Sequence, residues 1–364
     1  MIFLSLLLLV STLTTVGPRD CSAELADIVE KYNVPGIVAV ATRHDQIVIK
    51  GAAGVRKVGA DACVTLDDQF HIGSCTKAMT ATLCALLVEE GKLKWTDTIP
   101  DVFPELADSI DPEWREVTLE RLLSHRGGVP PNIDAPGVRG KVKLTGPIVE
   151  QRQILLEAVV ASPPLSKPGS QFLYSNLGYT IAGHMAEKVT GKSWEELMGE
   201  RIFAPLKMSS AGFGAPGETE TLDQPRGHSA AGAPIEPGPA ADNPPLIGPA
   251  GTVHCTIGDW SKFVALHLLG DEGDATLLKS ETFRKLHIPP PDKTMYAMGW
   301  GVAERPWGGG DILTHAGSNT LWHAVVFVAP KRDFAILVCC NAGGDVAAKA
   351  CDDAASMLVN AMTR

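Results

Sequence analysis

The sequence contains no run of Lys or Arg and no Cys-x-x-Cys pair, and its apolar N-terminal stretch is too short to span a bilayer comfortably. Acidic residues outnumber basic ones, 42 to 32, for a formal net charge of −10. Because no basic patch forms, we expect no nucleic-acid partner. Because His and Cys do not cluster at ligand spacing, we expect no metal. We expect no organic cofactor either.

The apolar N-terminal stretch, residues 1–16, is typical of the core of a signal peptide. Small residues at Cys21–Ala23 suit a signal peptidase. We therefore predict a signal peptide over residues 1–23 and an exported protein, periplasmic or secreted, with no stable membrane span after cleavage. The usual basic residue is missing, since no Lys or Arg precedes Arg19. The alternative is a buried N-terminal segment or an uncleaved anchor.

Eight cysteines are present, an even number that would permit disulfides in an exported protein. Cys84, however, lies in an apolar helical pattern, and Cys339 and Cys340 lie in an apolar run. These three have the character of small buried hydrophobic residues. The pairing state of the cysteines stays open.

Apolar patterns near both ends of the chain predict strands, and those in the middle predict helices. The strands are expected at 37–41, 46–51, 299–302, 311–314, 322–328 and 334–338. The helices are expected at 24–33, 119–125, 148–161, 177–189, 194–206, 257–270, 280–287 and 345–363. Residues 214–249, rich in Pro, Gly and Ala, predict a long loop, and such loops are usually functional or mobile.

This order of elements predicts an α+β fold. The N- and C-terminal segments would form one antiparallel sheet flanked by helices, with a largely helical middle domain inserted between them. Within a single domain over 24–364, we assign the sheet part to about 24–90 and 290–364, and the helical part to about 91–289.

One stretch, His71 to Lys77, opens a helix that we expect to end at Gly91. Ser74 then lies at the N-terminus, and Lys77 lies one turn later on the same face. A serine nucleophile needs an adjacent base, and burial together with the helix dipole would favour a neutral Lys77. The Ser74 amide could also stabilise an oxyanion. The alternative is a serine N-cap followed by a surface lysine.

Two further motifs follow Ser74-Cys75-Thr76-Lys77, namely Tyr174-Ser175-Asn176 and His315-Ala316-Gly317. In this order they resemble the serine β-lactamase-like family, which includes class C β-lactamases, D-alanyl-D-alanine carboxypeptidases, D-aminopeptidases and esterases. The resemblance extends over nearly all of the predicted mature chain, through segments at 122–128, 189–206, 248–251 and 341–344.

The resemblance implies a serine hydrolase that forms an acyl-enzyme on a small or peptide-like ester or amide. Tyr174, with Lys77, would take the Ser74 proton and pass it to the leaving group. Proximity to Lys77 would favour the Tyr174 phenolate. Asn176 would hydrogen-bond both Lys77 and the acyl amide of the substrate. The alternatives are a buried core tyrosine and an asparagine N-cap.

In the third motif, Gly317 would let the substrate lie against a strand edge. The Ser318 amide would complete the oxyanion hole with that of Ser74. His315 would position the substrate, but it replaces the more common lysine and is a weaker anchor for a substrate carboxylate. Ala316 lacks the threonine hydroxyl. Both changes favour an esterase, peptidase or aminopeptidase over an efficient β-lactamase.

The main alternative is a penicillin-binding receptor or sensor that is acylated without efficient turnover. A non-catalytic scaffold of the same fold is a further alternative. We interpret His125 and His254 as structural histidines, and we leave Trp300 and Trp322 open between the cleft and the core.

Overall fold

A computed structural model describes residues 17–142, 145–273, 277–291 and 295–364. Most of the predicted signal peptide, residues 1–16, lies outside the described residues. The rest of it is part of the fold. Strand β1 (Arg19–Asp20) pairs in parallel with strand β3, and Cys21 is fully buried. Helix α1 (Ser22–Tyr32) includes Ala23, so a cut after that residue would fall within its first turn.

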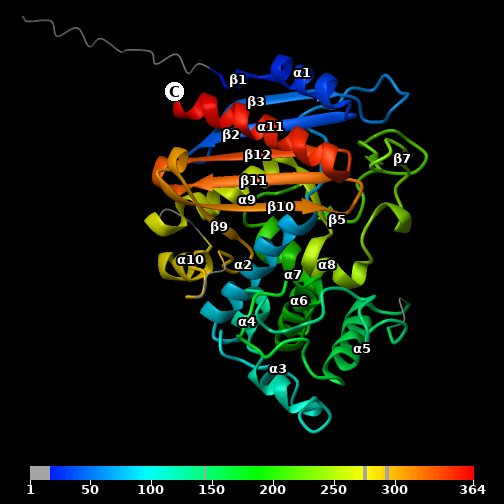
Figure 1. Ribbon diagram of the computed structural model, residues 1–364, viewed down its shortest axis with the longest axis vertical. Helices are drawn as coiled ribbons and strands as arrows, with labels where there is room; N and C mark the ends of the chain where they lie inside the picture. The colour runs from blue at the N-terminus through cyan, green and yellow to red at the C-terminus, as the bar shows by residue number, and fades with distance from the viewer. Residues whose placement is uncertain (1–16, 143–144, 274–276, 292–294) are drawn as a thin grey trace, which may run out of the picture.

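Within the described ranges, seven strands form the main sheet, in the order β1-β3-β2-β12-β11-β10-β9 (Figure 1). The N-terminal hairpin of β2 (Gly36–Arg43) and β3 (Gln46–Gly54) joins the C-terminal strands through antiparallel pairing of β2 with β12. The C-terminal strands are β9 (Gly301–Arg305), β10 (Gly310–Ser318), β11 (His323–Ala329) and β12 (Phe334–Cys340). The two ends of the chain therefore build one sheet, as predicted.

Both faces of this sheet are covered, which explains why every residue of β12 is buried. Alternate residues of β12, including Ile336 and Val338, pack in one core with α1 and α11 (Gly344–Thr363). Leu337 belongs to the opposite core, which contains α9 (Ile257–Leu269). Figure 1 shows α1 and α11 lying across one face. The α+β class is confirmed.

The middle of the chain supplies most of the remaining helices. They are α3 (Ile99–Val102), α4 (Leu119–Leu123), α5 (Ile148–Val160), α6 (Asn176–Thr190), α7 (Trp194–Met198), α8 (Gly248–Gly251) and α10 (Ser280–His287). Helices α3 to α6 gather beyond the β9 end of the sheet (Figure 1). Helix α9 also comes from the stretch that we assign to the helical part, yet it packs on β2 and β12.

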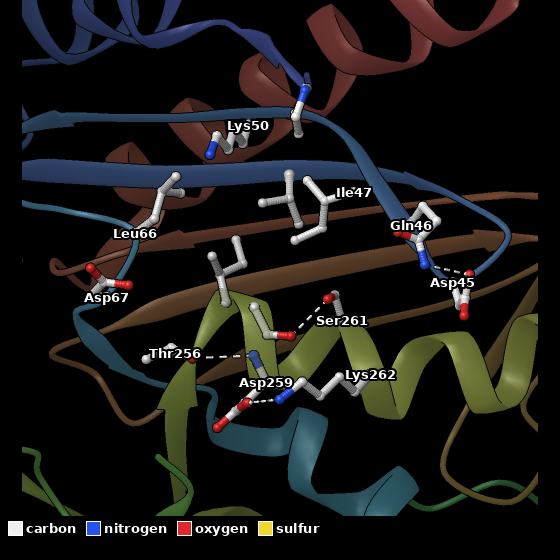
Figure 2. Close-up of a pocket in the computed structure, with 14 residues that line it drawn as sticks. Asp45, Gln46, Ile47, Lys50, Leu66, Asp67, Thr256, Asp259, Ser261 and Lys262 are labelled. Atoms are coloured by element: carbon white, nitrogen blue, oxygen red, sulfur yellow. Dashed lines mark hydrogen bonds and ion pairs between the residues drawn. The ribbon is translucent and has the colours of Figure 1, made fainter. Parts of the chain in front are cut away.

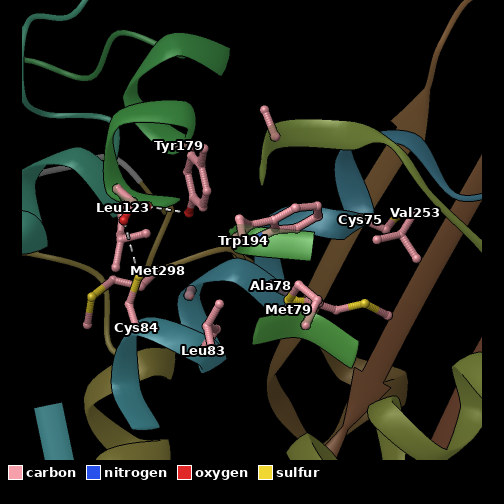
Figure 3. Packing of buried hydrophobic residues seen from close by; sticks show 14 of the residues in the cluster. Cys75, Ala78, Met79, Leu83, Cys84, Leu123, Tyr179, Trp194, Val253 and Met298 are labelled. Atoms are coloured by element: carbon pink, nitrogen blue, oxygen red, sulfur yellow. Dashed lines mark hydrogen bonds between the residues drawn. The ribbon is translucent and has the colours of Figure 1, made fainter. Parts of the chain in front are cut away.

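Helix α2 (Thr76–Glu89) runs through the centre of the molecule and is buried on every side from Thr76 to Leu87. The threonines between the apolar residues are buried because their hydroxyls are satisfied, as in the bonds from Thr80 to the Pro249 carbonyl and from Thr82 to the Ala78 carbonyl. Figure 3 shows Ala78, Met79 and Leu83 packed among side chains from several other elements.

Several local features differ from the sequence prediction. Strand β10 extends through the third motif, which was expected to follow a shorter strand. A second sheet of β4 (Gln69–His71), β8 (Val253–Thr256) and β5 (Gly212–Phe213) was not predicted, because strands this short carry little periodicity. The expected loop 214–249 contains the strand pair β6 (Gly227–His228) and β7 (Pro234–Ile235). A π-helical turn at Gly199–Phe203 follows α7.

The structure also decides the open assignments for tryptophan and cysteine burial. Trp300 and Trp322 are each 1% exposed and lie in the core. All eight cysteines are unpaired, and only Cys63 is exposed. Among the described residues, no helix has the length and apolar character needed to cross a membrane.

A hollow of about 520 Å³ opens between the β2–β3 hairpin and the start of α9 (Figure 2). Its lining includes Asp45, Lys50, Asp67 and Lys262. None of the motif residues lines it, so we assign it no part in the chemistry that follows.

Candidate active site

Ser74 lies in a tight turn between β4 and α2. A 3₁₀ turn at Gly73–Cys75 precedes the α-helix, so Ser74 stands one turn before Lys77. Gly73 adopts φ +50°, and a Cβ there would lie 2.4 Å from the Ser318 nitrogen. Only glycine allows this conformation and this close approach together.

Gly317 meets the same turn from the side of β10. A Cβ on Gly317 would lie 2.0 Å from the Ile72 carbonyl oxygen and 2.8 Å from the Ser74 nitrogen. The expected role of Gly317 as open space for substrate is therefore corrected, since the backbone of the serine turn fills that space. The two glycines bring the backbone segments of Ser74 and Ser318 against each other.

The amine of Lys77 is fully buried and makes three polar contacts. Its Nζ lies 2.8 Å from Asn176 Oδ1, 2.7 Å from the Ala250 carbonyl oxygen and 3.1 Å from Ser74 Oγ. Burial lowers the pKa of Lys77 to about 7.

A neutral amine has two hydrogens and one lone pair. Asn176 Oδ1 and the Ala250 carbonyl can only accept, so they take the two hydrogens. In that form the lone pair of Lys77 faces the Ser74 hydroxyl, whereas an ammonium would donate its third hydrogen to Ser74 Oγ. The contacts therefore accommodate both protonation states, and the neutral form can accept the serine proton.

Tyr174 stands beside the same two residues. Lys77 Nζ lies 4.8 Å from the centre of its ring, and the Ser74 side chain lowers the pKa of its phenol. Burial outweighs this effect of Ser74 and raises the pKa of Tyr174 well above its usual value. The expectation of a favoured phenolate is therefore wrong, because desolvation dominates and Tyr174 stays a neutral phenol.

Asn176 is the first residue of α6. The helix is capped by Ser175, whose hydroxyl accepts from the Gly178 amide, so the N-cap alternative for Asn176 is wrong. The Asn176 side chain is thus available to accept from Lys77, while its Nδ2 donates to Asn132 Oδ1 at 2.7 Å.

His315 is buried in β10 and fixed in one tautomer. Its Nδ1 lies 2.7 Å from the Ala316 carbonyl oxygen, which can only accept. Nε2 is therefore the acceptor for the Tyr296 hydroxyl, 3.0 Å away. Burial lowers the pKa of His315 to about 4, so the ring is uncharged at neutral pH.

In the part of the chain that the structure describes, strand β9 does not pair with the end of β10 that carries this histidine. Within the described residues, the pairing of β9 runs along β10 from Gly310 to Thr314, whereas β11 pairs up to Ser318. Ala316 and Ser318 are exposed and His315 and Gly317 are buried, as alternation along a strand requires.

Sequence reasoning did not assign His125, Tyr296 or Asn132 to this site. The ring of His125 lies 4.2 Å from that of Tyr174, and its Nδ1 accepts from the Ser175 amide. His125 is thus structural, as interpreted, but it supports the second motif directly. For His125, the one sequence feature that could have indicated a role was its position in the segment 122–128, which resembles the family. No sequence feature indicated Tyr296 or Asn132.

The described residues contain no group of three or more His, Cys, Asp or Glu side chains arranged to hold a metal ion. His254 Nδ1 donates a hydrogen bond to the Gly214 carbonyl oxygen, which is a structural contact.

A family model, Beta-lactamase, matches residues 22–359. This chain belongs to the Beta-lactamase family. Penicillin-binding protein 4 of Amycolatopsis lactamdurans is 28% identical over 327 residues, covering 86% of this chain and 82% of the relative. An unguisins hydrolase of Aspergillus violaceofuscus is 25% identical over 88% of this chain, which spans only 61% of that protein.

Solved structures with the same fold are also found. A penicillin-binding protein homologue from Pyrococcus abyssi, described as octameric, aligns with TM-score 0.73 and 24% identity over 93% of this chain and 76% of its own. The D-alanine carboxypeptidase AmpC from Burkholderia cenocepacia aligns with TM-score 0.74 and 19% identity over 93% of this chain and 97% of its own. At these identities the likeness concerns the fold alone.

Proposed function

We propose that this protein is a serine hydrolase that cleaves an ester or amide through an acyl-enzyme on Ser74. The observation that carries the proposal is the contact set of the buried Lys77, whose Nζ lies 3.1 Å from Ser74 Oγ and is held by the oxygens of Asn176 and Ala250. In its neutral form, a lysine held in this way is a general base for the serine proton.

In the proposed mechanism, Ser74 Oγ attacks the substrate carbonyl carbon while its proton passes to Lys77 Nζ. The backbone amides of Ser74 and Ser318 stabilise the resulting oxyanion. Tyr174, as a neutral phenol, donates its own proton to the leaving group, and the ammonium of Lys77 returns the serine proton to the phenolate so formed. Lys77, neutral again, then takes a proton from a water molecule that attacks the acyl carbon, and Ser74 Oγ leaves with that proton as the acid is released.

We infer that the preferred substrate has no carboxylate beside the scissile bond. The tautomer of His315 supports this inference, because Nδ1 donates to the Ala316 carbonyl and Nε2 accepts from Tyr296. An imidazole with its pKa lowered to about 4 offers no positive charge. An uncharged ester or amide group at this position fits better than the carboxylate of a penicillin or of a C-terminal peptide.

The test is hydrolysis of p-nitrophenyl butyrate by the purified chain and by Ser74→Ala, with circular dichroism to verify the fold. The variant should lose turnover by at least about a thousandfold, because no other group replaces the nucleophile. A folded Ser74→Ala protein with wild-type turnover would refute the assignment.

The second candidate is a penicillin-binding receptor that remains acylated, favoured by the 28% identity to a penicillin-binding protein. A fluorescent penicillin distinguishes the two. A stable adduct that outlasts many ester turnovers supports the receptor, whereas rapid loss of label, or no labelling beside active ester hydrolysis, supports the hydrolase.

We also propose that the protein is exported and acts on a small or peptide-like carbonyl substrate. The apolar residues 1–16 support export. The pairing of β1 and the burial of Cys21 favour a cleavage point before Arg19 over the predicted one after Ala23.

A further inference from the structure

The long Pro/Gly/Ala-rich segment brings a carboxylate behind the serine turn. Asp242 follows a 3₁₀ turn at Pro239–Ala241, and its Oδ1 lies 2.6 Å from Nε2 of His71. The His71 side chain is fully buried and that of Asp242 is 9% exposed. None of the family motifs above includes Asp242, and the proposed chemistry does not use it.

The other nitrogen of His71 holds the backbone next to the nucleophile. The Gly73 amide donates to His71 Nδ1 at 3.1 Å. Because Nδ1 accepts, the ring proton of the neutral imidazole must be on Nε2, next to Asp242. Among the described residues Nε2 has no partner in hydrogen-bond geometry, so the contact with Asp242 is a short electrostatic one, and the negative charge beside Nε2 favours the tautomer whose Nδ1 binds the Gly73 amide.

Asp242 also contacts the second backbone segment of the oxyanion hole. The Asn319 side-chain nitrogen lies 3.3 Å from Asp242 Oδ1 and 3.1 Å from the Ala241 carbonyl oxygen. Asn319 directly follows Ser318, and its Oδ1 accepts from the Leu321 amide at 3.2 Å. One carboxylate is therefore linked to the segments that carry both oxyanion donors.

The adjacent residue connects the same loop to the base. Asn243 Nδ2 donates to the Gly251 carbonyl at 2.9 Å. Gly251 follows Ala250, whose carbonyl oxygen accepts from Lys77. The loop thus supports the serine turn, the end of β10 and the acceptor of the base together.

We propose that Asp242 is a positioning residue for the oxyanion hole. Through His71 and Asn319 it holds the Ser74 and Ser318 amides where the carbonyl oxygen of an ester or amide becomes negative. Asp242 does not touch the substrate and transfers no proton. The inference rests on the proposed function, and the experiments below distinguish a failure of this inference from a failure of the proposed function.

The first experiment compares Asp242→Asn with Asp223→Asn, a matched change in the same loop. Asp223 is exposed and accepts from the Glu218 amide. With active sites counted by complete fluorophosphonate labelling, Asp242→Asn should lower kcat for p-nitrophenyl butyrate about ten- to a hundredfold with little change in KM, since misaligned donors weaken binding of the transition state alone. Asp223→Asn should match the wild type. An unchanged kcat per labelled site in Asp242→Asn would overturn the proposal.

The second experiment determines the tautomer of His71 by NMR and does not depend on catalytic activity. The full chain is labelled with ¹⁵N-histidine, and the His71 signals are assigned by their absence from a His71→Gln spectrum. The wild type should hold the proton on Nε2, and Asp242→Asn should lose this preference because an amide can also donate to Nε2.

A wild-type His71 with its proton on Nδ1 would contradict the proposal even if Asp242→Asn did not fold. If the wild type failed to hydrolyse any ester, the proposed function would fail, and the tautomer would still report on the link between Asp242 and His71.

Discussion

Lys77 is the residue whose environment determines the chemistry of the site. Its ammonium form would have to lose hydration without a carboxylate among its hydrogen-bond partners, which are Ser74, Asn176 and Ala250. Burial therefore lowers its pKa from 10.5 to about 7. The sequence predicted a lysine one turn after the serine, but a Ser-x-x-Lys pattern does not specify burial.

This pKa predicts the pH dependence of acylation. The active form is the neutral amine, which predominates above the pKa, so kcat/KM for an uncharged ester should rise with pH through about 7 and then level off. The measurement is a pH–rate profile of fluorophosphonate labelling and of ester hydrolysis. His315 should add no second step near neutrality, because its pKa is lowered to about 4. A rise centred near pH 10 would mean that Lys77 keeps an ordinary pKa and would contradict the assignment.

At the scale of elements, the site depends on the packing of the serine turn against β10. No side chain fits between them, because the Gly317 position faces backbone atoms that cannot rotate away. The sequence suggested glycine at this position for a different reason, room for the substrate. That mistake has a physical cause, since a motif shows where glycine is required but not which atoms approach it.

We predict that Gly317→Ala lowers the free energy of unfolding by about 1–3 kcal/mol, as overpacking does, and removes most of the ester hydrolysis. The matched control is Gly258→Ala, where the nearest atom to a new Cβ is a hydroxyl oxygen at 3.9 Å and φ needs no glycine. Urea unfolding and ester turnover measure both effects. Wild-type stability and activity in Gly317→Ala would show that the contact is not required.

The whole molecule joins the two chain ends in one sheet and encloses α2 between that sheet and the helices of the middle region (Figure 1). Strand β1 extends the sheet by one short parallel strand, and the Cys21 amide donates to the Lys50 carbonyl at 2.9 Å. Residues 19–23 thus belong to the folded protein, although the sequence assigned them to the signal peptide. Small residues suit a peptidase and a close-packed helix start equally well, so composition could not separate the two.

Truncation tests this boundary. A chain that begins at Arg19 should unfold at the same urea concentration as one that begins at Gly17. A chain that begins at Glu24 should unfold at lower urea, because it lacks β1, the buried Cys21 and the first two residues of α1. Equal urea-unfolding midpoints for all three chains would support the predicted end of the signal peptide after Ala23.

The sequence by itself determined most of the longer helices and strands and the order of the motifs. Local periodicity is sufficient for the hairpin at 36–54, for α5, α6 and α11, and for the serine one turn before a lysine. It also predicted a sheet built from both chain ends, since strands in an α+β domain must pair to bury their faces.

Only the tertiary structure decided the states of the side chains. The lowered pKa of Lys77, the raised pKa of Tyr174 and the fixed tautomer of His315 depend on groups brought from distant segments, such as Ala250 and Tyr296. The contact of Asp242 with His71 likewise crosses about half of the chain. Desolvation and hydrogen bonding act between residues that are close in space, and the sequence alone does not show which distant residues become neighbours.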